Sequence, residues 1–290
     1  MLKIEIHSKY YPKQLLKIKN PPKQLYIEGN IEILNKLSIA IIGSRNCSAN
    51  GAKLAEKFGQ EIAGQGLCVV SGMAKGIDAY AHKGALQING KTIAVLGTGL
   101  DNIFPKENKE LYYKIIENDG AVITEYPPKT EIKSKQFLER NRIVSGLSLG
   151  ILVVEAAYRS GTSVTARIAK EQNRKVFVLP HEIDNSHGVG SNKLIQKGAI
   201  LTTSTKDIIE QFECLEYKEN VFMKNNKTIT NFKFSSQEEK EIYNLIKSNK
   251  KYIEDIYKNT KIPINKINES ILILEIKGYI QKTKGGYICI

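Results

Sequence analysis

Three turns of this chain place glycine beside hydroxyl or basic side chains, a combination that suits the binding of phosphate. They are Gly43-Ser44-Arg45, Ser71-Gly72 and Ser160-Gly161-Thr162, and each comes after an apolar run. Glycine lets the backbone approach an anion, a hydroxyl donates a hydrogen bond to it, and a guanidinium offers a planar pair of donors. A fourth apolar run ends in Gly97-Thr98-Gly99. We therefore expect the four turns to bind phosphate at one site, although a surface arginine that closes a turn would explain the first tripeptide alone.

A basic segment around one phenylalanine meets a second requirement for binding nucleic acid. Its members are Lys129, Lys133, Lys135, Arg140 and Arg142 around Phe137, with Asn141 between the two arginines. Cations neutralise phosphates, and an aromatic face stacks on a base for about 1–3 kcal/mol. In the alternative interpretation, Phe137 belongs to the core and its neighbours to a solvated surface. We favour single-strand binding, because the Arg140 to Arg142 tripeptide is expected to open a helix toward the phosphate-binding turns.

Three carboxylates near these turns could act in catalysis, but their positions also suit structural roles. Asp78 lies where a helix is expected to begin, Glu155 ends an apolar run, and Glu125 is a third candidate. A carboxylate at a helix start commonly caps the helix or orients the amides of the preceding loop, and we favour this role for Asp78. For Glu155 a loop-organising role is at least as good. No nucleophile with a neighbouring base accompanies them, so we expect no catalytic residue.

The chain lacks the sequence fingerprints of nucleotide cofactors and of metal sites. Gly43 does not belong to a GxGxxG motif, and the turn at Gly161 lacks the lysine of a triphosphate-binding loop. The four cysteines are far apart in the sequence, and neither they nor the four histidines show metal-ligand spacing. We therefore expect neither a cofactor nor a metal ion.

The composition favours a polyanionic partner. Lysine and arginine number 43 against 30 aspartates and glutamates, a formal net charge of +13, which attracts nucleic acid or an anionic surface. A lysine-rich composition shared by a whole genome would produce the same surplus. The sequence has no apolar stretch long enough to cross a bilayer and no secretory signal at its amino terminus. We expect a soluble cytoplasmic protein without a membrane partner.

The elements that must position these groups alternate between strand and helix from about residue 38 to residue 212. This alternation is typical of a doubly wound, mostly parallel α/β sheet. Apolar runs predict strands that begin at Ile39, Val69, Ala94 and Ile151. Helices are expected near 50–65, 77–88, 106–118, 137–147, 162–173 and 189–197. Because the carboxyl ends of parallel strands meet at one edge of a sheet, the turns should converge on a single crevice.

The rest of the chain predicts a linker and a small second domain. The first domain is expected over residues 1–213, including a short lead-in that packs on the sheet, and the polar stretch 214–230 indicates a linker. Residues 231–290 predict three helices, the first with a possible capping box at Ser236 and Glu239, followed by a hairpin at Gly285-Gly286. This order is typical of a winged helix-turn-helix.

Such a domain could contact either duplex DNA or protein, and the sequence leaves both open. Its third helix offers only Lys266 and Lys277 as basic residues, which weakens the case for DNA.

In chain order, these motifs resemble those of the DNA-processing protein A family, also called DprA or Smf. The matching residues are Gly43-Ser44-Arg45, Ser71 to Asp78 with Ala81-His82, Gly97 to Asp101 with Phe104-Pro105 and Asn108, Thr124-Glu125, Phe137 with Arg140-Asn141-Arg142, Glu155, Ser160-Gly161-Thr162 with Thr165-Ala166, and Gly190 with Asn192, Leu194-Ile195 and Gly198-Ala199. The resemblance spans roughly residues 10–212, and the outline of the second domain is similar to the family's winged-helix domain.

The resemblance implies an extended Rossmann fold and a function in DNA processing. Members of the family bind single-stranded DNA, protect incoming strands in natural transformation, load the recombinase RecA on them and usually work as homodimers. Carried over by position, the DNA-binding pocket would be lined by Arg45, Ser71-Gly72, Lys106, the Lys133 to Arg142 segment and Ser160-Gly161-Thr162. The register ahead of Phe137 leaves Lys133 and Lys135 as alternatives. Pro180-His181 departs from the family's usual Pro-Gly, which leaves the shape of the loop that follows open.

The leading hypothesis is a non-catalytic protein that binds single-stranded DNA. In it, Arg45, Lys106, Arg140 and Arg142 hold phosphates, and bases stack against Phe137. The rival hypothesis is an enzyme that binds or hydrolyses a nucleotide on a related Rossmann-like fold, with Glu155, Asp78 and Glu125 as its candidate acids.

Overall fold

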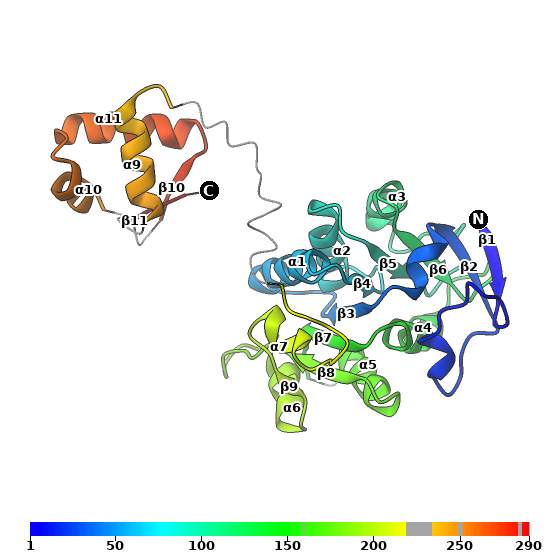
Figure 1. Cartoon of the computed structure of the whole chain (residues 1–290). Helices are drawn as coiled ribbons and strands as arrows, with labels where there is room; N and C mark the ends of the chain where they lie inside the picture. The colour runs from blue at the N-terminus through cyan, green and yellow to red at the C-terminus, as the bar shows by residue number, and fades with distance from the viewer. Residues whose placement is uncertain (159, 219–233, 249–251, 284–285, 290) are drawn as a thin grey trace. The chain divides into compact units, whose positions relative to one another are not determined.

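The computed structural model describes residues 1–158, 160–218, 234–248, 252–283 and 286–289. Contacts between residues divide the chain into two compact units, Met1–Asn225 and Asn226–Ile290 (Figure 1). The expected ends of the linker, at 213 and 230, lie on either side of this division. Most of that linker lies outside the described residues, and the two units are described separately below.

A nine-stranded sheet forms the centre of the first unit. Its strands lie in the order β1-β2-β6-β5-β4-β3-β7-β8-β9. Their bounds are β1 Leu2–Glu5, β2 Gln24–Gly29, β3 Ser38–Gly43, β4 Cys68–Ser71, β5 Thr92–Val95, β6 Ala121–Thr124, β7 Gly150–Glu155, β8 Lys175–Val178 and β9 Ile200–Leu201. Within this order, all neighbouring strands from β6 through β5, β4, β3, β7 and β8 to β9 pair in parallel. At one edge, β1 pairs antiparallel with β2, and β2 pairs antiparallel with β6. The predicted mostly parallel α/β sheet is confirmed.

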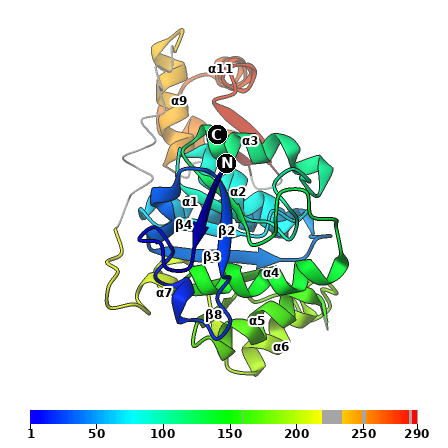
Figure 2. The same cartoon turned by 90° about the vertical axis from the view of Figure 1, so that its right-hand side faces the viewer.

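Helices cover both faces of this sheet, as alternating apolar residues along each strand require. Their bounds are α1 Ala49–Gly64, α2 Ile77–Gln87, α3 Lys109–Glu117, α4 Ser134–Leu147, α5 Gly161–Glu171, α6 Val189–Gln196 and α7 Thr205–Ile209. Along β3, Ile39 and Ile41 point toward the helices α1, α2 and α7, whereas Ala40 and Ile42 point toward α4 and α5. Figure 2 shows α1 to α3 on one side of the strands and α4 to α6 on the other. Both layers are therefore built from the period-two pattern of buried strands.

The sheet changes its direction of growth between the neighbouring strands β3 and β7. From β3 the chain adds β4, β5 and β6 on one side, and it then returns to place β7 on the other side of β3. Ligands of open α/β sheets bind outside the carboxyl ends of the strands at such a reversal. The turn after β3, the turn after β4 and the start of α5 meet there.

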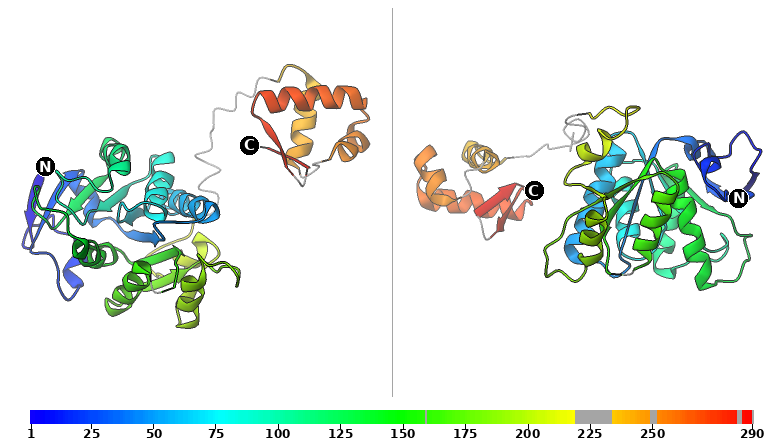
Figure 3. Two further views of the ribbon diagram at one scale, coloured as in Figure 1. Left: turned by 180° about the vertical axis from the view of Figure 1, so that it is seen from behind. Right: turned by 90° about the horizontal axis from the view of Figure 1, so that it is seen from below.

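The amino-terminal segment does more than lead into the sheet. It adds β1 as the edge strand and β2 beside it, at the outer end seen in Figure 3, and it packs Leu15 and Ile18 against α4 in the core. Sequence reasoning expected only the packing. The strand β2 is short of apolar runs because one of its neighbours is an edge strand, so its pattern was weak.

The described residues of the second unit form three helices and a hairpin around a small core. Its elements are α9 Gln237–Lys247, α10 Ile253–Thr260, α11 Ile264–Ile276, β10 Ile280–Thr283 and β11 Gly286–Cys289, the last two paired antiparallel. The Ser236 hydroxyl accepts a hydrogen bond from the Glu239 amide at 3.1 Å, which caps α9 as expected. Gly285, at the predicted hairpin turn, lies outside the described residues. The elements follow the predicted order, and a winged-helix fold stays a prediction.

In the part of the chain that the structure describes, none of the helices is long and apolar enough to cross a membrane.

Candidate nucleic-acid interface

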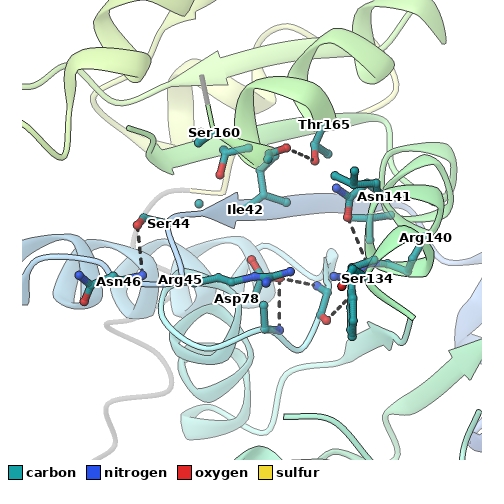
Figure 4. Close-up of a pocket in the computed structure, with 18 of the residues that line it drawn as sticks. Ile42, Ser44, Arg45, Asn46, Asp78, Ser134, Arg140, Asn141, Ser160 and Thr165 are labelled. Carbon is teal, nitrogen blue, oxygen red and sulfur yellow. Dashed lines mark hydrogen bonds between the residues drawn. The ribbon is translucent and has the colours of Figure 1, made fainter. Parts of the chain in front are cut away.

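A cavity of about 660 Å³ opens at the carboxyl ends of the central strands. Its walls come from the turn after β3, the loop after β4, and the starts of α4 and α5, whose side chains point toward one another in Figure 4. The lining residues are Ile42, Gly43, Ser44, Arg45, Asn46, Gly72, Ala74, Asp78, Phe104, Ser134, Phe137, Leu138, Arg140, Asn141, Val144, Ser160, Gly161, Thr162 and Thr165. Three of the four expected turns, those after β3 and β4 and the one at the start of α5, line this cavity, whereas Gly97-Thr98-Gly99 after β5 does not.

One wall of the cavity stacks a cation on two aromatic rings. The Arg45 guanidinium carbon lies 5.5 Å from the centre of the Phe137 ring, and the Phe137 and Phe104 rings are 5.4 Å apart. Phe104 is 40% exposed, so one aromatic face remains open to solvent. Among the described residues no carboxylate forms a salt bridge with Arg45. Its charge is therefore available to a ligand that also offers a flat apolar surface.

Close packing behind the first turn explains its glycine. The Ser44 amide donates to the Glu155 carbonyl oxygen at 2.8 Å, and a Cβ at Gly43 would lie 2.9 Å from the same oxygen. The Ser44 hydroxyl accepts a hydrogen bond from the Asn46 amide at 3.2 Å. A larger residue at position 43 would push the turn, and Arg45 with it, away from the strand end.

Two of the three candidate acids organise loops. The buried Glu155 carboxylate accepts hydrogen bonds from the Ser48 amide at 2.8 Å and the Ser48 hydroxyl at 2.6 Å, just before α1. Asp78 accepts from the amides of Gly72 at 3.1 Å and Ala74 at 3.4 Å, so it holds the loop after β4. Burial raises the pKa of Asp78, against the lowering effect of Arg140 and these two amides. Both carboxylates have the structural roles that the sequence favoured.

Arg140 lies in the floor of the cavity, where backbone oxygens occupy its guanidinium. It is only 4% exposed, and its Nη1 donates to the carbonyl oxygens of Gly72 and Val95. Its Nε donates to Asn141 Oδ1 at 3.2 Å. Burial lowers the pKa of Arg140 to about 10, an effect that the charge of Asp78 opposes. Nη1 and Nε therefore already have partners, and among the described residues only Nη2 of Arg140 is left for the phosphate that the sequence led us to expect there.

Arg142 and Ser71 are also engaged elsewhere. Arg142 forms two hydrogen bonds to the Glu125 carboxylate, at 2.6 and 2.7 Å, and does not line the described cavity. The Ser71 hydroxyl is fully buried and donates to the Ile41 carbonyl oxygen at 2.6 Å. Neither side chain presents a free donor to a ligand in the cavity, contrary to the sequence expectation. Asn141, between the two arginines, does line the cavity.

The expected lysines lie on the exposed surface near the cavity and not in its wall. Lys106 begins the short helix Lys106–Asn108, and Lys133 immediately precedes α4. Lys135 pairs with Glu139 at 3.2 Å. Lys133, just before α4, and Lys135, within it, are both exposed, so the structure leaves them as alternatives for the side chain that faces DNA.

Sequence reasoning missed Lys75, which lines a smaller hollow of about 130 Å³ beside the main cavity. The other lining residues of this hollow are Arg45, Gly72, Ala74, Phe104, Pro105, Phe137 and Arg140. Lys75 forms a salt bridge with Glu107 at 2.5 Å. Lys75 lies in a loop between Gly72 and Gly76, and this position in the sequence could have indicated that it lies near the cavity. The missed side chains Asn46, Ser134 and Thr165 are single polar residues without any distinguishing spacing.

The start of α5 contributes free donors opposite Arg45. The first amides of a helix have no partner within it, so those of Gly161 and Thr162 favour an anion. The Ser160 hydroxyl is buried and has no hydrogen-bond partner among the residues that the structure describes. Thr165, one turn later, donates to the Gly161 carbonyl oxygen at 3.1 Å. In the same described part, no cluster of three His, Cys, Asp or Glu side chains could hold a metal ion.

Comparison with known proteins places this site in a family. The family model of DNA recombination-mediator protein A matches residues 3–213. Protein Smf of Escherichia coli is 37% identical over 290 residues, which cover 98% of this chain and 76% of the relative. DNA processing protein DprA of Streptococcus pneumoniae is 45% identical over 203 residues, which cover 70% of this chain and 71% of the relative.

Solved structures agree with the sequence comparison. The X-ray structure of DNA processing protein A from Streptococcus pneumoniae has a TM-score of 0.69 at 41% identity and covers 75% of each chain. The protein from Helicobacter pylori, whose structure concerns its single-stranded DNA binding mode, has a TM-score of 0.65 at 31% identity, covering 73% of this chain and 95% of that one. With a matching family model over most of the first unit, relatives along nearly the whole sequence and the same fold, the chain belongs to the DNA recombination-mediator protein A family.

Proposed function

We propose that the first unit binds one strand of DNA in the cavity, largely independently of base sequence. Arg45 holds a phosphate, and a base stacks on the ring pair Phe104 and Phe137. The observation that carries this proposal is the stack of Arg45 on Phe137, because it joins an unpaired cation to an open aromatic face. The Helicobacter pylori relative, whose structure concerns binding of single-stranded DNA, supports it.

Further phosphates would lie along a basic path outside the cavity. The exposed lysines Lys106, Lys133 and Lys135 lie near its rim in sequence and structure, and the amides at the start of α5 add neutral donors. This arrangement assigns phosphate binding to Arg45 and the lysines, and it leaves Arg140 and Arg142 to structural contacts.

The salt dependence of affinity tests the proposal. With about four phosphates neutralised at a slope of roughly −0.7 each, affinity for a single strand falls about 50-fold between 50 and 200 mM salt. Fluorescence anisotropy of a labelled oligothymidine, with a duplex of equal length as competitor, measures both affinity and preference. An affinity that does not respond to salt, or a preference for the duplex, would overturn the proposal.

The rival function, an enzyme acting on a nucleotide, finds little support in this geometry. Asp78 and Glu155 bind backbone amides, and Glu125 binds Arg142. Each acid is thus committed to holding a loop or a helix. Turnover of a nucleoside monophosphate that is abolished by Glu155→Gln would restore the rival.

The biological role we propose follows the family. Bound strands are protected during natural transformation and passed to the recombinase RecA in the cytoplasm, by a homodimer of this chain. Light scattering of the purified protein tests the dimer. Strand exchange by RecA on protein-coated single strands tests the loading, and exchange no faster with the protein than without it would contradict that role.

A further inference from the structure

Arg140 is largely buried, and its side chain joins helix α4 to the ends of two strands behind the cavity. It projects from α4 one turn after Phe137, and Nη1 donates to the last carbonyl of β5, at Val95, and to the carbonyl of Gly72 after β4. The helix that carries the stacking ring is thereby tied to the ends of two strands.

The loop after β4 is held from two sides by opposite charges. Arg140 binds the carbonyl oxygen of Gly72, while Asp78 binds the amide of the same residue at 3.1 Å and that of Ala74 at 3.4 Å. Neither charged group is exposed by more than 7%. Buried charges that are hydrogen-bonded to the backbone favour one arrangement of the loop, since moving the loop away would leave these charges without their partners.

Gly72 shows how closely the guanidinium packs on this loop. A Cβ at this position would overlap the Arg140 guanidinium group. Its backbone has no positive φ, so alanine would meet no conformational strain there beyond this overlap. An alanine therefore displaces Arg140 without removing any charge.

We propose that Arg140 is a positioning residue of the DNA site, an inference that rests on the proposed function. Its role is not to bind phosphate; it locks the start of α4 onto the ends of β4 and β5, and so holds the Phe137 ring beside Arg45 and Phe104. Losing it should weaken stacking of a base and spare the contacts to phosphate.

Two variants and one matched control test this role in the full-length chain. Arg140→Lys keeps the charge but lacks the planar donors that reach two carbonyls and Asn141, and Gly72→Ala displaces the guanidinium from the other side. The control is Arg174→Lys, because Arg174 also donates to two backbone carbonyls, of Gln14 and Gly146 at 3.0 Å each, and does not line the cavity.

Affinities are measured for labelled oligothymidine and for an abasic strand of equal length, with thermal unfolding measured alongside. Arg140→Lys and Gly72→Ala should each bind oligothymidine about fivefold or more weakly, the lower end of the effect of one lost stacked base. Their affinity for the abasic strand and their salt slopes should match the wild type. Arg174→Lys should lose thermal stability and keep both affinities.

Each other outcome contradicts the inference. Wild-type affinity of Arg140→Lys for oligothymidine, or an equal loss on both strands, would show that Arg140 does not act through the stacking ring. Should Arg140→Lys not fold, Gly72→Ala decides by the same criteria. If the wild-type protein itself fails to bind oligothymidine, the proposed function falls; if only the variants behave as wild type, this inference alone falls.

Discussion

The cavity of the first unit and helix α11 of the second unit differ in how they use charge. In the cavity wall, Arg45 has no acidic partner among the described residues and lies on an aromatic ring. Helix α11, the expected recognition helix, carries a single lysine and two glutamates, and that lysine, Lys266, pairs with Glu238 at 3.3 Å. A net charge of +13 therefore says little about where an anion binds. What matters is which cations are left without a partner.

The two regions also differ in the apolar side chains that they expose: those beside Arg45 in the cavity are aromatic, and those of α11 are aliphatic. Phe104 and Phe137 present rings beside a cation, whereas α11 exposes the aliphatic side chains Ile264, Leu272 and Ile276, the last to 78%. Aromatic faces suit bases, and aliphatic side chains do not stack on them. Under the proposed function, single-strand binding therefore belongs to the first unit, and the following experiments test this difference between the two units.

Removal of the unpaired cation should have the largest effect. Arg45→Ala loses a charged hydrogen bond worth about 1.5–3 kcal/mol, which corresponds to roughly a 10- to 100-fold weaker affinity for oligothymidine. The salt slope should become shallower by about 0.7, the share of one phosphate. Anisotropy titrations at several salt concentrations measure both. Arg167→Ala is the control, since Arg167 is exposed on α5 and pairs with Glu171 outside the cavity; equal losses for both variants would refute the assignment.

Removal of the stacking ring should come next. Phe137→Ala is expected to cost about 1–3 kcal/mol of binding free energy for the base that stacks on it. Because no charge is lost, the salt slope should stay that of the wild type. Phe137→Tyr keeps the ring and should bind nearly as the wild type does. A loss as large for Phe137→Tyr as for Phe137→Ala would argue against stacking.

In the second unit, the buried ion pair should matter for folding and not for DNA. Burial would raise the pKa of Glu239, but the hydrogen bonds from Lys277, at 2.9 Å, and from the Ser235 amide hold it below its ordinary value. A carboxyl with a lowered folded-state pKa stabilises the fold above its unfolded pKa, and this stabilisation is lost as pH falls through the folded value. Unfolding of the second unit by acid should begin below about pH 4.

Glu239→Gln checks this prediction by thermal unfolding followed across pH. The variant should be less stable at neutral pH and should lose less stability on acidification, while binding oligothymidine as the wild type does. A stability of the wild-type unit that is flat between neutral pH and pH 3 would contradict the role of this pair.

The smallest effect is expected from removing the second unit altogether. Because no cation of α11 is left free for phosphate, a chain ending at Asn225 should keep its affinity for oligothymidine within about twofold, the usual limit for independent regions. Affinity for duplex DNA is measured on the same chain. A large loss of single-strand affinity would show that the second unit shares in the binding, and the comparison would fail.

The sequence predicted the layout of the cavity well, because it depends on local rules. Apolar runs followed by glycine mark strand ends, and parallel strands bring their ends to one edge, so the turns at Gly43, Gly72 and Gly161 could be placed together. Helix starts could be placed within three residues of those observed, as at α4, expected from 137 and found from Ser134. The structural roles of Asp78 and Glu155 also followed from their places at a helix start and a strand end.

The roles of the arginines could not be predicted in the same way. Arg140 lies on the buried face of α4 with Ile143, Val144 and Leu147, and this helical spacing was a signal that it is buried. A buried basic residue usually has a partner. The sequence alone does not show which residue that partner is. Arg142 depends on Glu125, which only the fold brings close. Sequence shows which residues can bind an anion, and three-dimensional contacts decide which of them are already occupied.

A tryptophan in place of Phe137 tests the central claim most directly. The chain contains no tryptophan, so Phe137→Trp gives a single reporter at the stacking position. The account predicts that oligothymidine quenches its fluorescence on binding, while an abasic strand or a duplex of the same length leaves it nearly unchanged. Binding of oligothymidine to saturation without quenching would show that no base stacks at this position, and it would contradict the account.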